Sequence, residues 1–176
     1  MPLVTLRTER LELRPPRMDD ADAIYHGYAT DAEVARYVVW TPHESVERTR
    51  AFLEHFMKDH GGDAGYPWII TLRQGGELIG AMHLRVSVPW AEFGFNLARA
   101  YWGQGYGSEA VKAVVDFGLA LPGVHRVQAT CHVDNSASAR AMEKGGMTRE
   151  GVLRSYITFP NLGEDPQDVC MYAATR

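Results

Sequence analysis

A glycine-rich stretch at residues 103–107 constrains this chain more than any other part of its sequence. Gly103, Gly105 and Gly107 alternate with larger residues. Because glycine has no Cβ, successive backbone N–H groups can turn toward one point without obstruction. A strand-like run at 91–98 precedes the stretch, and a helix-like run follows it from near Ser108. A strand, such a loop and a helix N-terminus together predict an anion-binding site suited to a pyrophosphate.

Three classes of cofactor could use this loop. A Walker P-loop requires the pattern GxxxxGK[ST], which the chain lacks. A dinucleotide fingerprint requires a third glycine where Ser108 stands, and it usually lies near the N-terminus of a βαβ unit. Coenzyme A, with its pyrophosphate, is the third class. From the loop alone, a plain glycine-rich surface turn also remains open.

The hydrophobic pattern alternates between strand-like and helix-like periods along the chain. A capping-box signal at Thr41 and Glu44, with Pro42 between them, predicts the start of an early helix. The glycine-rich residues 61–65 predict a loop too short to separate domains. Strands are predicted at 11–14, 68–72, 78–88, 91–98, 127–133, 152–159 and 169–175, and a further helix at 136–144. This mixture predicts an α+β (mixed α/β) sheet protein with one domain, residues 1–176.

The composition favours a globular protein over a nucleic-acid-binding one. Of 176 residues, 45% are hydrophobic and the net charge is −4, which argues against nucleic acid or an anionic membrane as the main partner. Cys131 and Cys170 lie in apolar alternating runs without a CxxC pattern, so we expect free core thiols. The first five residues lack a signal-peptide pattern and no apolar run could span a bilayer, so the expected location is cytoplasmic.

Two longer stretches are similar to the motifs of a known enzyme family. The first is AEFGFNL at 91–97, followed by YWGQGYGSEA at 101–110. The second is VDNSAS at 133–138, followed by EKGGM at 143–147. With RLELRP at 10–15 and DVCMY at 168–172, these stretches resemble the GNAT superfamily of N-acetyltransferases. The resemblance is to the branch that acetylates ribosomal-protein N-termini, and it covers nearly the whole chain.

The resemblance implies a fold and a cosubstrate. The fold is a twisted mixed β-sheet, splayed at its centre and flanked by about four helices, and the cosubstrate is acetyl-CoA without a metal. Pantetheine is expected to pair with the backbone near residues 95–97, and the pyrophosphate to lie on the N–H groups of residues 103–108. The expected cofactor contacts are Phe95, Asn96, Leu97, Trp102, Gly103, Gln104, Gly105, Tyr106, Gly107, Ser108, Asn135 and Ser138.

The chain departs from the broad family's pattern at two positions that bear on the site. Trp102 stands where the family's loop usually begins with arginine or glutamine, although the ribosomal branch tolerates this change. Met142 stands where many members carry a tyrosine that acts as general acid, and a thioether has no proton to give. Ser138 lies four residues earlier, and in the resembled branch a serine takes that role.

Acetyl transfer to an amine requires a base for the ammonium proton and a donor for the leaving thiolate. Glu92 opens the strand that leads to the glycine loop and is the candidate base; a solvated strand carboxylate is the alternative. Ser138 is the candidate donor to the thiolate, unless it is a plain helix-surface hydroxyl. Asn135 is expected to hold cofactor or strand backbone, and it is also a good helix N-cap.

Other chemistry-bearing residues are expected to have structural roles. His83 or His132 could assist proton transfer, but packing or exposure is the expectation for both. Core packing is likewise expected for most of the large aromatic residues that could wall an acceptor pocket. These are Trp40, Trp68, Trp90 and Tyr156. No close set of His, Asp, Glu and Cys has metal-ligand spacing, so no metal is expected.

The predicted function is therefore acetyl transfer from acetyl-CoA to a primary amine by direct attack in a ternary complex. A protein N-terminal α-amino group is the preferred acceptor. A small-molecule amine, such as a metabolite or an antibiotic, and a non-catalytic acetyl-CoA-binding module are the alternatives. Acceptor pockets are built from loops that have no readable code, so the sequence leaves the acceptor open. It also leaves open whether the protein is a monomer or a homodimer.

Overall fold

The central strands of the sheet, β5 (Trp90–Leu97) and β6 (Arg126–His132), run parallel to each other, whereas every other neighbouring pair in the described chain is antiparallel. The computed structural model describes residues 4–58 and 65–176, so residues 61–64 of the predicted glycine-rich loop lie outside it. Within the described residues the strand order is β1-β2-β3-β4-β5-β6-β8-β7. The remaining strands are β1 (Leu6–Arg7), β2 (Leu11–Arg14), β3 (Tyr66–Leu72), β4 (Leu78–Ser87), β7 (Thr148–Ile157) and β8 (Gln167–Thr175).

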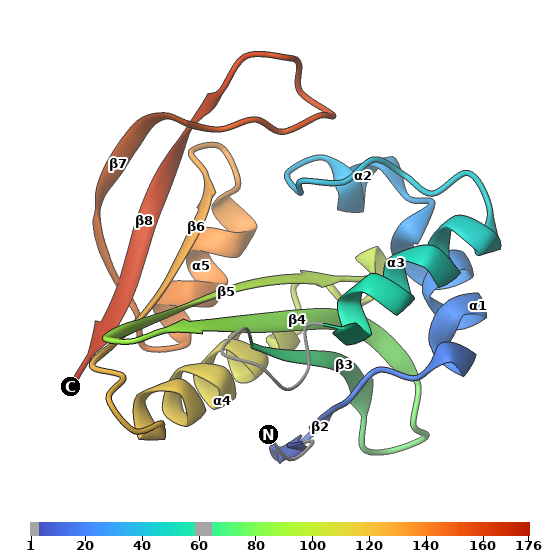
Figure 1. The fold of residues 1–176 in the computed structure, drawn as a ribbon, viewed down its shortest axis with the longest axis horizontal. Coiled ribbons are helices and arrows are strands. Elements are labelled where there is room, and N and C mark those ends of the chain that lie inside the picture. The colour runs from blue at the N-terminus through green and yellow to red at the C-terminus, as the bar shows by residue number, and fades with distance from the viewer. Residues whose placement is uncertain (1–3, 59–64) are drawn as a thin grey trace.

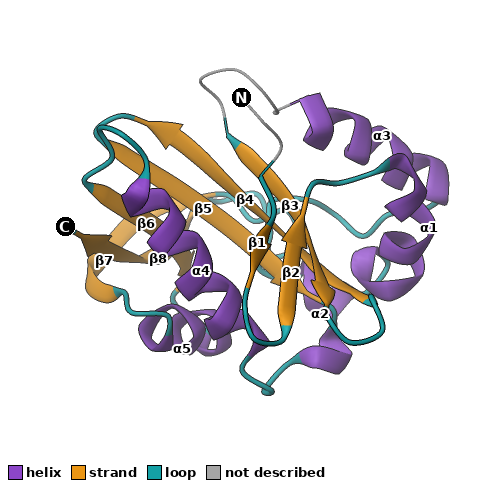
Figure 2. Ribbon diagram, turned by 90° about the horizontal axis from the view of Figure 1, so that it is seen from below, coloured by secondary structure: helices purple, strands orange, loops and turns teal. Residues whose placement is uncertain are grey.

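Helices cover both faces of the sheet. In Figure 1, α3 lies over the right-hand end of strands β3 to β5 with α1 beside it, and α4 lies below these strands. Figure 2, seen from below, shows α4 and α5 running across the same face. The helices are η1 (Met18–Asp20), α1 (Ala21–Ile24), the π-helical η2 (Tyr25–Ala29), α2 (Ala32–Ala35), α3 (Val46–Lys58), η3 (Arg99–Tyr101), α4 (Tyr106–Ala120) and α5 (Ser136–Lys144).

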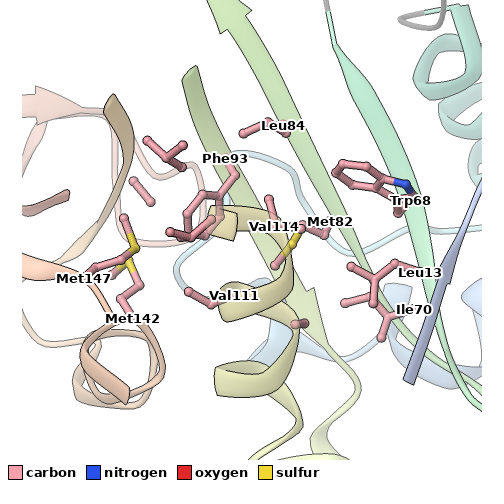
Figure 3. Packing of buried hydrophobic residues seen from close by; sticks show 14 of the residues in the cluster. Leu13, Trp68, Ile70, Met82, Leu84, Phe93, Val111, Val114, Met142 and Met147 are labelled. Atoms are coloured by element: carbon pink, nitrogen blue, oxygen red, sulfur yellow. The ribbon is translucent and has the colours of Figure 1, made fainter. Parts of the chain in front are cut away.

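The core is divided by the sheet into a larger and a smaller part. On β3, Ile70 packs toward α4 whereas its neighbour Ile69 packs toward α1 and α3, as the two-residue period of a strand requires. Figure 3 shows part of the larger cluster, in which Val111 and Val114 of α4 lie close to Met82 and Phe93. Both faces of β3 are therefore buried, and this fixes that part of the sheet between its two helical layers.

The sheet is splayed between β5 and β6. These strands pair only at Trp90–Glu92 with Arg126–Gln128, and beyond Glu92 and Gln128 they have no paired register. Figure 1 shows β6 rising away from β5 after this short joint. The predicted mixed sheet with a central splay is therefore confirmed, and the splay opens an edge of β5 that faces no other strand.

Two helix starts differ from the sequence prediction. The capping-box signal at Thr41 and Glu44 is not used, because α3 begins at Val46 and Ser45 Oγ accepts the N–H of Arg48. The backbone N–H of His43 instead donates to Ala29 O on η2, which draws residues 41–45 into a loop. The helix after the glycine loop begins at Tyr106, two residues before the predicted Ser108.

Candidate active site

The glycine loop has the backbone conformation that its sequence predicts. Gly103 and Gly105 have φ angles of 74° and 83°, in the left-handed region that favours glycine. A Cβ built on Gly103 meets no atom within 4 Å, and one built on Gly105 meets only Nη2 of Arg10, at 3.4 Å. Both glycines are exposed, so open space lies beside the loop where a ligand can approach the backbone.

The N-terminus of α4 is left uncapped by side chains. Gly105 occupies the cap position, and no side chain of the described residues accepts a hydrogen bond from the first turn of α4. The comparable positions of α2 and α5 are capped by Asp31 and Asn135. The leading N–H groups of a helix carry its positive dipole end, so this N-terminus suits an anionic ligand such as a pyrophosphate.

The side chains of Trp102 and Gln104 donate hydrogen bonds to residues that precede the glycine loop. The Trp102 indole N–H donates to Leu97 O at 2.8 Å, and the Gln104 amide donates to Ala100 O at 2.8 Å. Both side chains therefore turn back toward the end of β5 and η3. In this arrangement the loop offers a ligand its backbone rather than these two side chains.

Close packing brings β5, α4 and α5 together at Gly107. A Cβ at Gly107 would lie 3.5 Å from Ala141 of α5, 3.5 Å from Phe95 and 3.6 Å from Leu97. Ser138 is three residues before Ala141 and thus on the same helix face. Five predicted site residues, Phe95, Leu97, Gly107, Asn135 and Ser138, consequently belong to segments that converge at the splay.

Asn135 and Ser138 form the first turn of α5. The Asn135 side chain accepts the Ser138 N–H at 3.1 Å, so the alternative role of Asn135 as an N-cap is present. The half-buried Ser138 side chain lies beside the Cys131 thiol. Burial and the neighbouring Cys170 raise the pKa of Cys131 to about 12, and Ser138 opposes this only weakly. Cys131 is therefore a neutral thiol at physiological pH, with little nucleophilic character.

The backbone of β5 offers hydrogen-bonding groups to the splay. Ala98 N–H donates to Ile79 O, toward β4, so strand alternation points the N–H groups of Phe95 and Leu97 at the opposite edge. β6 does not pair with this edge beyond Glu92. The Asn96 side chain points to the face away from α4, where it lies beside the Tyr28 hydroxyl. Burial raises the pKa of that hydroxyl, which is thus fully protonated.

Glu92 lies at the point where β5 and β6 separate, on the face of the sheet opposite α4. It is the last residue of β5 in register with β6, where it faces Gln128. The Gln128 amide N–H donates to Glu92 Oε2 at 2.9 Å, and Gln128 Oε1 accepts Arg126 Nε–H at 2.8 Å. The Arg126 guanidinium in turn forms two hydrogen bonds with Glu150. No hydrogen bond among the described residues joins Glu92 directly to Ser138.

The sequence did not predict this polar chain of hydrogen bonds, which runs from Glu92 through Gln128 and Arg126 to Glu150. Gln128 and Arg126 alternate with the apolar residues of β6, so the sequence does indicate that they share a face. Their meeting with Glu92 depends on the parallel register of β5 and β6, which residue patterns do not encode. The arginine fixes the glutamine amide, because a flipped amide would set its oxygen against the Glu92 carboxylate.

The remaining residues that the sequence suggested for the site are large aromatic residues and histidines. Of the aromatic residues expected in the core, Trp68 is buried and donates its indole N–H to Val4 O at 2.7 Å, and Trp40 is partly buried. Trp90 and Tyr156 are exposed, so the expectation of core packing is wrong for these two. His132 is buried, stacks on Tyr37 and accepts the Asp134 N–H at Nδ1. Across residues 4–58 and 65–176, no three His, Cys, Asp or Glu side chains gather in a way that could hold a metal ion. Among these residues, every helix is too short or too polar to cross a membrane.

Comparison with known proteins agrees with this arrangement. The family described as the acetyltransferase (GNAT) domain matches residues 10–148. The uncharacterised N-acetyltransferase YoaA of Bacillus subtilis (strain 168) is 34% identical over 174 residues, which cover 97% of this chain and 96% of YoaA.

Solved structures share the fold over nearly their whole length. A GNAT-family acetyltransferase from Bacillus anthracis superposes with a TM-score of 0.84 at 28% identity, covering 98% of both chains. RimL, a ribosomal L7/L12 α-N-protein acetyltransferase solved with coenzyme A, superposes with a TM-score of 0.84 at 22% identity, again covering 98% of both chains. The family match over most of the sequence and the relation to YoaA establish that the chain belongs to the GNAT family and is an N-acetyltransferase that uses acetyl-CoA.

Proposed function

We propose that the protein acetylates the α-amino group of a protein N-terminus by direct attack of the amine on acetyl-CoA, with both substrates bound at once. The uncapped N-terminus of α4, preceded by Gly103 and Gly105 in left-handed conformations, is the observation that carries the cofactor site. The N–H groups of residues 103–108 would hold the pyrophosphate. The free edge of β5 at Phe95 and Leu97 would pair with pantetheine, and its N–H groups are donors for charge that develops on the carbonyl oxygen.

Acetyl-CoA supplies a thioester whose carbonyl carbon is open to attack by a neutral amine. An α-amino group has a pKa near 8, so much of it is protonated at neutral pH and a base is required. Glu92 fits this role, because Gln128 occupies only its Oε2 and leaves Oε1 for the ammonium proton. Ser138 would hydrogen-bond the departing sulfur from the first turn of α5.

The proposed acceptor side is the face of the sheet that carries Glu92. On that side α2 and the β7–β8 connection border an open pocket of about 420 Å³, lined by Ala32, Glu33, Arg36, Asn161 and Leu162. Asn161 donates to Ala35 O and Trp40 O at 2.6 and 2.8 Å, which ties the two segments together. Glu33 and Arg36 give this pocket groups of both signs, one for the amine and one for the carbonyl oxygens of an incoming peptide. The likeness to RimL, which is described as an α-N-protein acetyltransferase, also supports an N-terminal acceptor.

Thiol release with matched acceptors tests the proposal. The acceptors are a peptide with a free N-terminal serine or alanine, the same peptide with a blocked N-terminus and an internal lysine, and a small polyamine. We expect rapid thiol release with the free N-terminus and at most slow release with the other two. If only the polyamine is acetylated, the proposed N-terminal acceptor is wrong, whereas the acetyltransferase activity stands. Absence of turnover with a wide amine panel, despite CoA binding, would favour a non-catalytic module.

A further inference from the structure

Glu109, in the first turn of α4, lies beside the proposed pyrophosphate loop. A carboxylate there would repel phosphates unless a cation compensates it. Its Oε1 accepts the Thr8 hydroxyl at 2.5 Å and the Arg10 N–H at 2.8 Å, and its Oε2 accepts Arg10 Nε–H at 2.7 Å. The turn between β1 and β2 therefore surrounds Glu109 with donors.

Arg10 also holds the loop itself. Its Nη1 donates to Gln104 O at 3.0 Å, and its guanidinium carbon lies 4.4 Å from the centre of the Tyr106 ring. Its Nη2 is the atom that a Cβ on Gly105 would meet. One side chain thus contacts Gln104 and Tyr106 of the loop, lies beside Gly105, and also pairs with Glu109.

The charge state of Glu109 supports a compensating role for Arg10. Burial acts to raise the pKa of Glu109, but the hydrogen bonds from Thr8 and Arg10 outweigh it and the pKa is lowered. The carboxylate is thus ionised at neutral pH. Its side chain is 18% exposed, so water screens it poorly and the arginine is its nearest counter-charge.

We propose that Arg10 is a positioning residue for the cofactor loop. It holds the backbone of residues 104–106 from the β1–β2 turn, and it neutralises Glu109, so the loop presents N–H groups to the phosphates without a competing carboxylate. The inference rests on the proposed cofactor site, and it assigns to the N-terminal hairpin a part in CoA affinity that lies outside the loop and helix of that site.

A double-mutant cycle tests the electrostatic part. We expect Arg10→Ala to weaken CoA binding about tenfold, because Glu109 then carries an uncompensated charge beside the phosphates and the loop loses its hydrogen bond from Arg10. Turnover at saturating acetyl-CoA should fall far less than affinity. In Arg10→Ala/Glu109→Gln the repelling charge is gone, so affinity should recover most of the loss. A role in packing alone would give no such rescue, because the second substitution removes more contacts.

Isothermal calorimetry with CoA at low and high salt is the measurement, with melting temperatures recorded in parallel. Lys112→Ala is the matched control, because Lys112 pairs with Asp116 on the same helix without touching the loop, and its affinity should equal that of the wild type. If Arg10→Ala fails to fold, Arg10→Lys is the replacement. It keeps the charge but cannot bond Glu109 and Gln104 O at the same time, so its loss of CoA affinity should be smaller than about tenfold. Unchanged affinity in the folded variant, or no rescue in the double variant, would overturn the inference.

Gly105→Val separates this inference from the cofactor site on which it rests. If Gly105→Val abolishes CoA binding while Arg10→Ala leaves it unchanged, the loop is the phosphate site and only the role of Arg10 is wrong. If a folded Gly105→Val protein binds CoA normally, the loop assignment itself is wrong.

Discussion

Ser138 and Met142 lie one turn apart on α5 but in different surroundings. Met142 is fully buried, and Figure 3 shows it next to Met147 at the edge of the core. Ser138 is half-buried at the start of the helix, close to the splay. Of these two positions, only Ser138 carries a hydroxyl with access to a ligand, and this supports its proposed role toward the leaving thiolate.

Removal of that hydroxyl is expected to slow chemistry without weakening cofactor binding. General acid assistance is typically worth about 10²- to 10⁴-fold, so Ser138→Ala should lose turnover in roughly that range. Steady-state thiol release beside CoA affinity is the measurement, and the exposed Ser136 on the same turn provides the control Ser136→Ala. Near-wild-type turnover in Ser138→Ala, where chemistry limits the rate, would show that another donor serves the thiolate.

Glu92→Gln is expected to lower turnover most at neutral pH and less at high pH, where free amine is abundant. The substitution keeps the side chain's shape but removes the proton acceptor. A pH–rate profile against the wild type measures this, with Glu150→Gln as a control for the far end of the polar chain. A profile that matches the wild type would remove Glu92 from the mechanism.

At the scale of elements, local patterns predict β2 and α5 with their observed limits but miss the start of α3. Residues 11–14 alternate between core and partly exposed positions, and β2 has these predicted limits. The Thr41 capping signal fails because His43 holds that segment in a loop: its backbone N–H donates to Ala29 O, and its ring Nδ1 is hydrogen-bonded to the Thr49 hydroxyl. A cap contributes about 1 kcal/mol, which such contacts easily outweigh.

Contacts across the sheet are the part of the site that the sequence does not reveal. Arg10 and Glu109 are 99 residues apart, and Glu92 and Gln128 are 36 apart. The loop could be recognised because its chemistry lies in consecutive residues. The polar partners could not, because each depends on which strand lies next to which.

The hairpin contact with Glu109 predicts an acid-sensitive contribution to stability. Because its folded pKa is lowered, the contribution is present above the unfolded value of about 4.3 and is lost as pH falls through the folded pKa. The free energy of unfolding of Glu109→Gln should therefore lie below that of the wild type at neutral pH, and the gap should narrow in acid. Urea denaturation of both proteins at neutral and at acidic pH measures this difference in the free energy of unfolding. A difference that does not change with pH would contradict this account.

At the scale of the whole molecule, the sheet consists of two antiparallel halves joined by the short β5–β6 pairing. A ligand that lies in the splay and contacts both β5 and α5 would link these halves. CoA at 100 times its Kd should then add about 2.7 kcal/mol of stability. For a chain of this size that corresponds to a rise in Tm of roughly 5–10 °C. Thermal denaturation with and without CoA measures the shift, and Gly105→Val should show none; an unchanged wild-type Tm would contradict it.

The opposite-face placement of Glu92 and α4 has a kinetic consequence. Donor and acceptor would approach through different openings, so neither substrate excludes the other from the enzyme. Initial-rate plots should therefore give intersecting lines rather than parallel ones, and CoA should inhibit without competing against the peptide. A peptide joined covalently to CoA through an acetyl bridge would occupy both openings together. It should compete with acetyl-CoA and bind more tightly than either substrate.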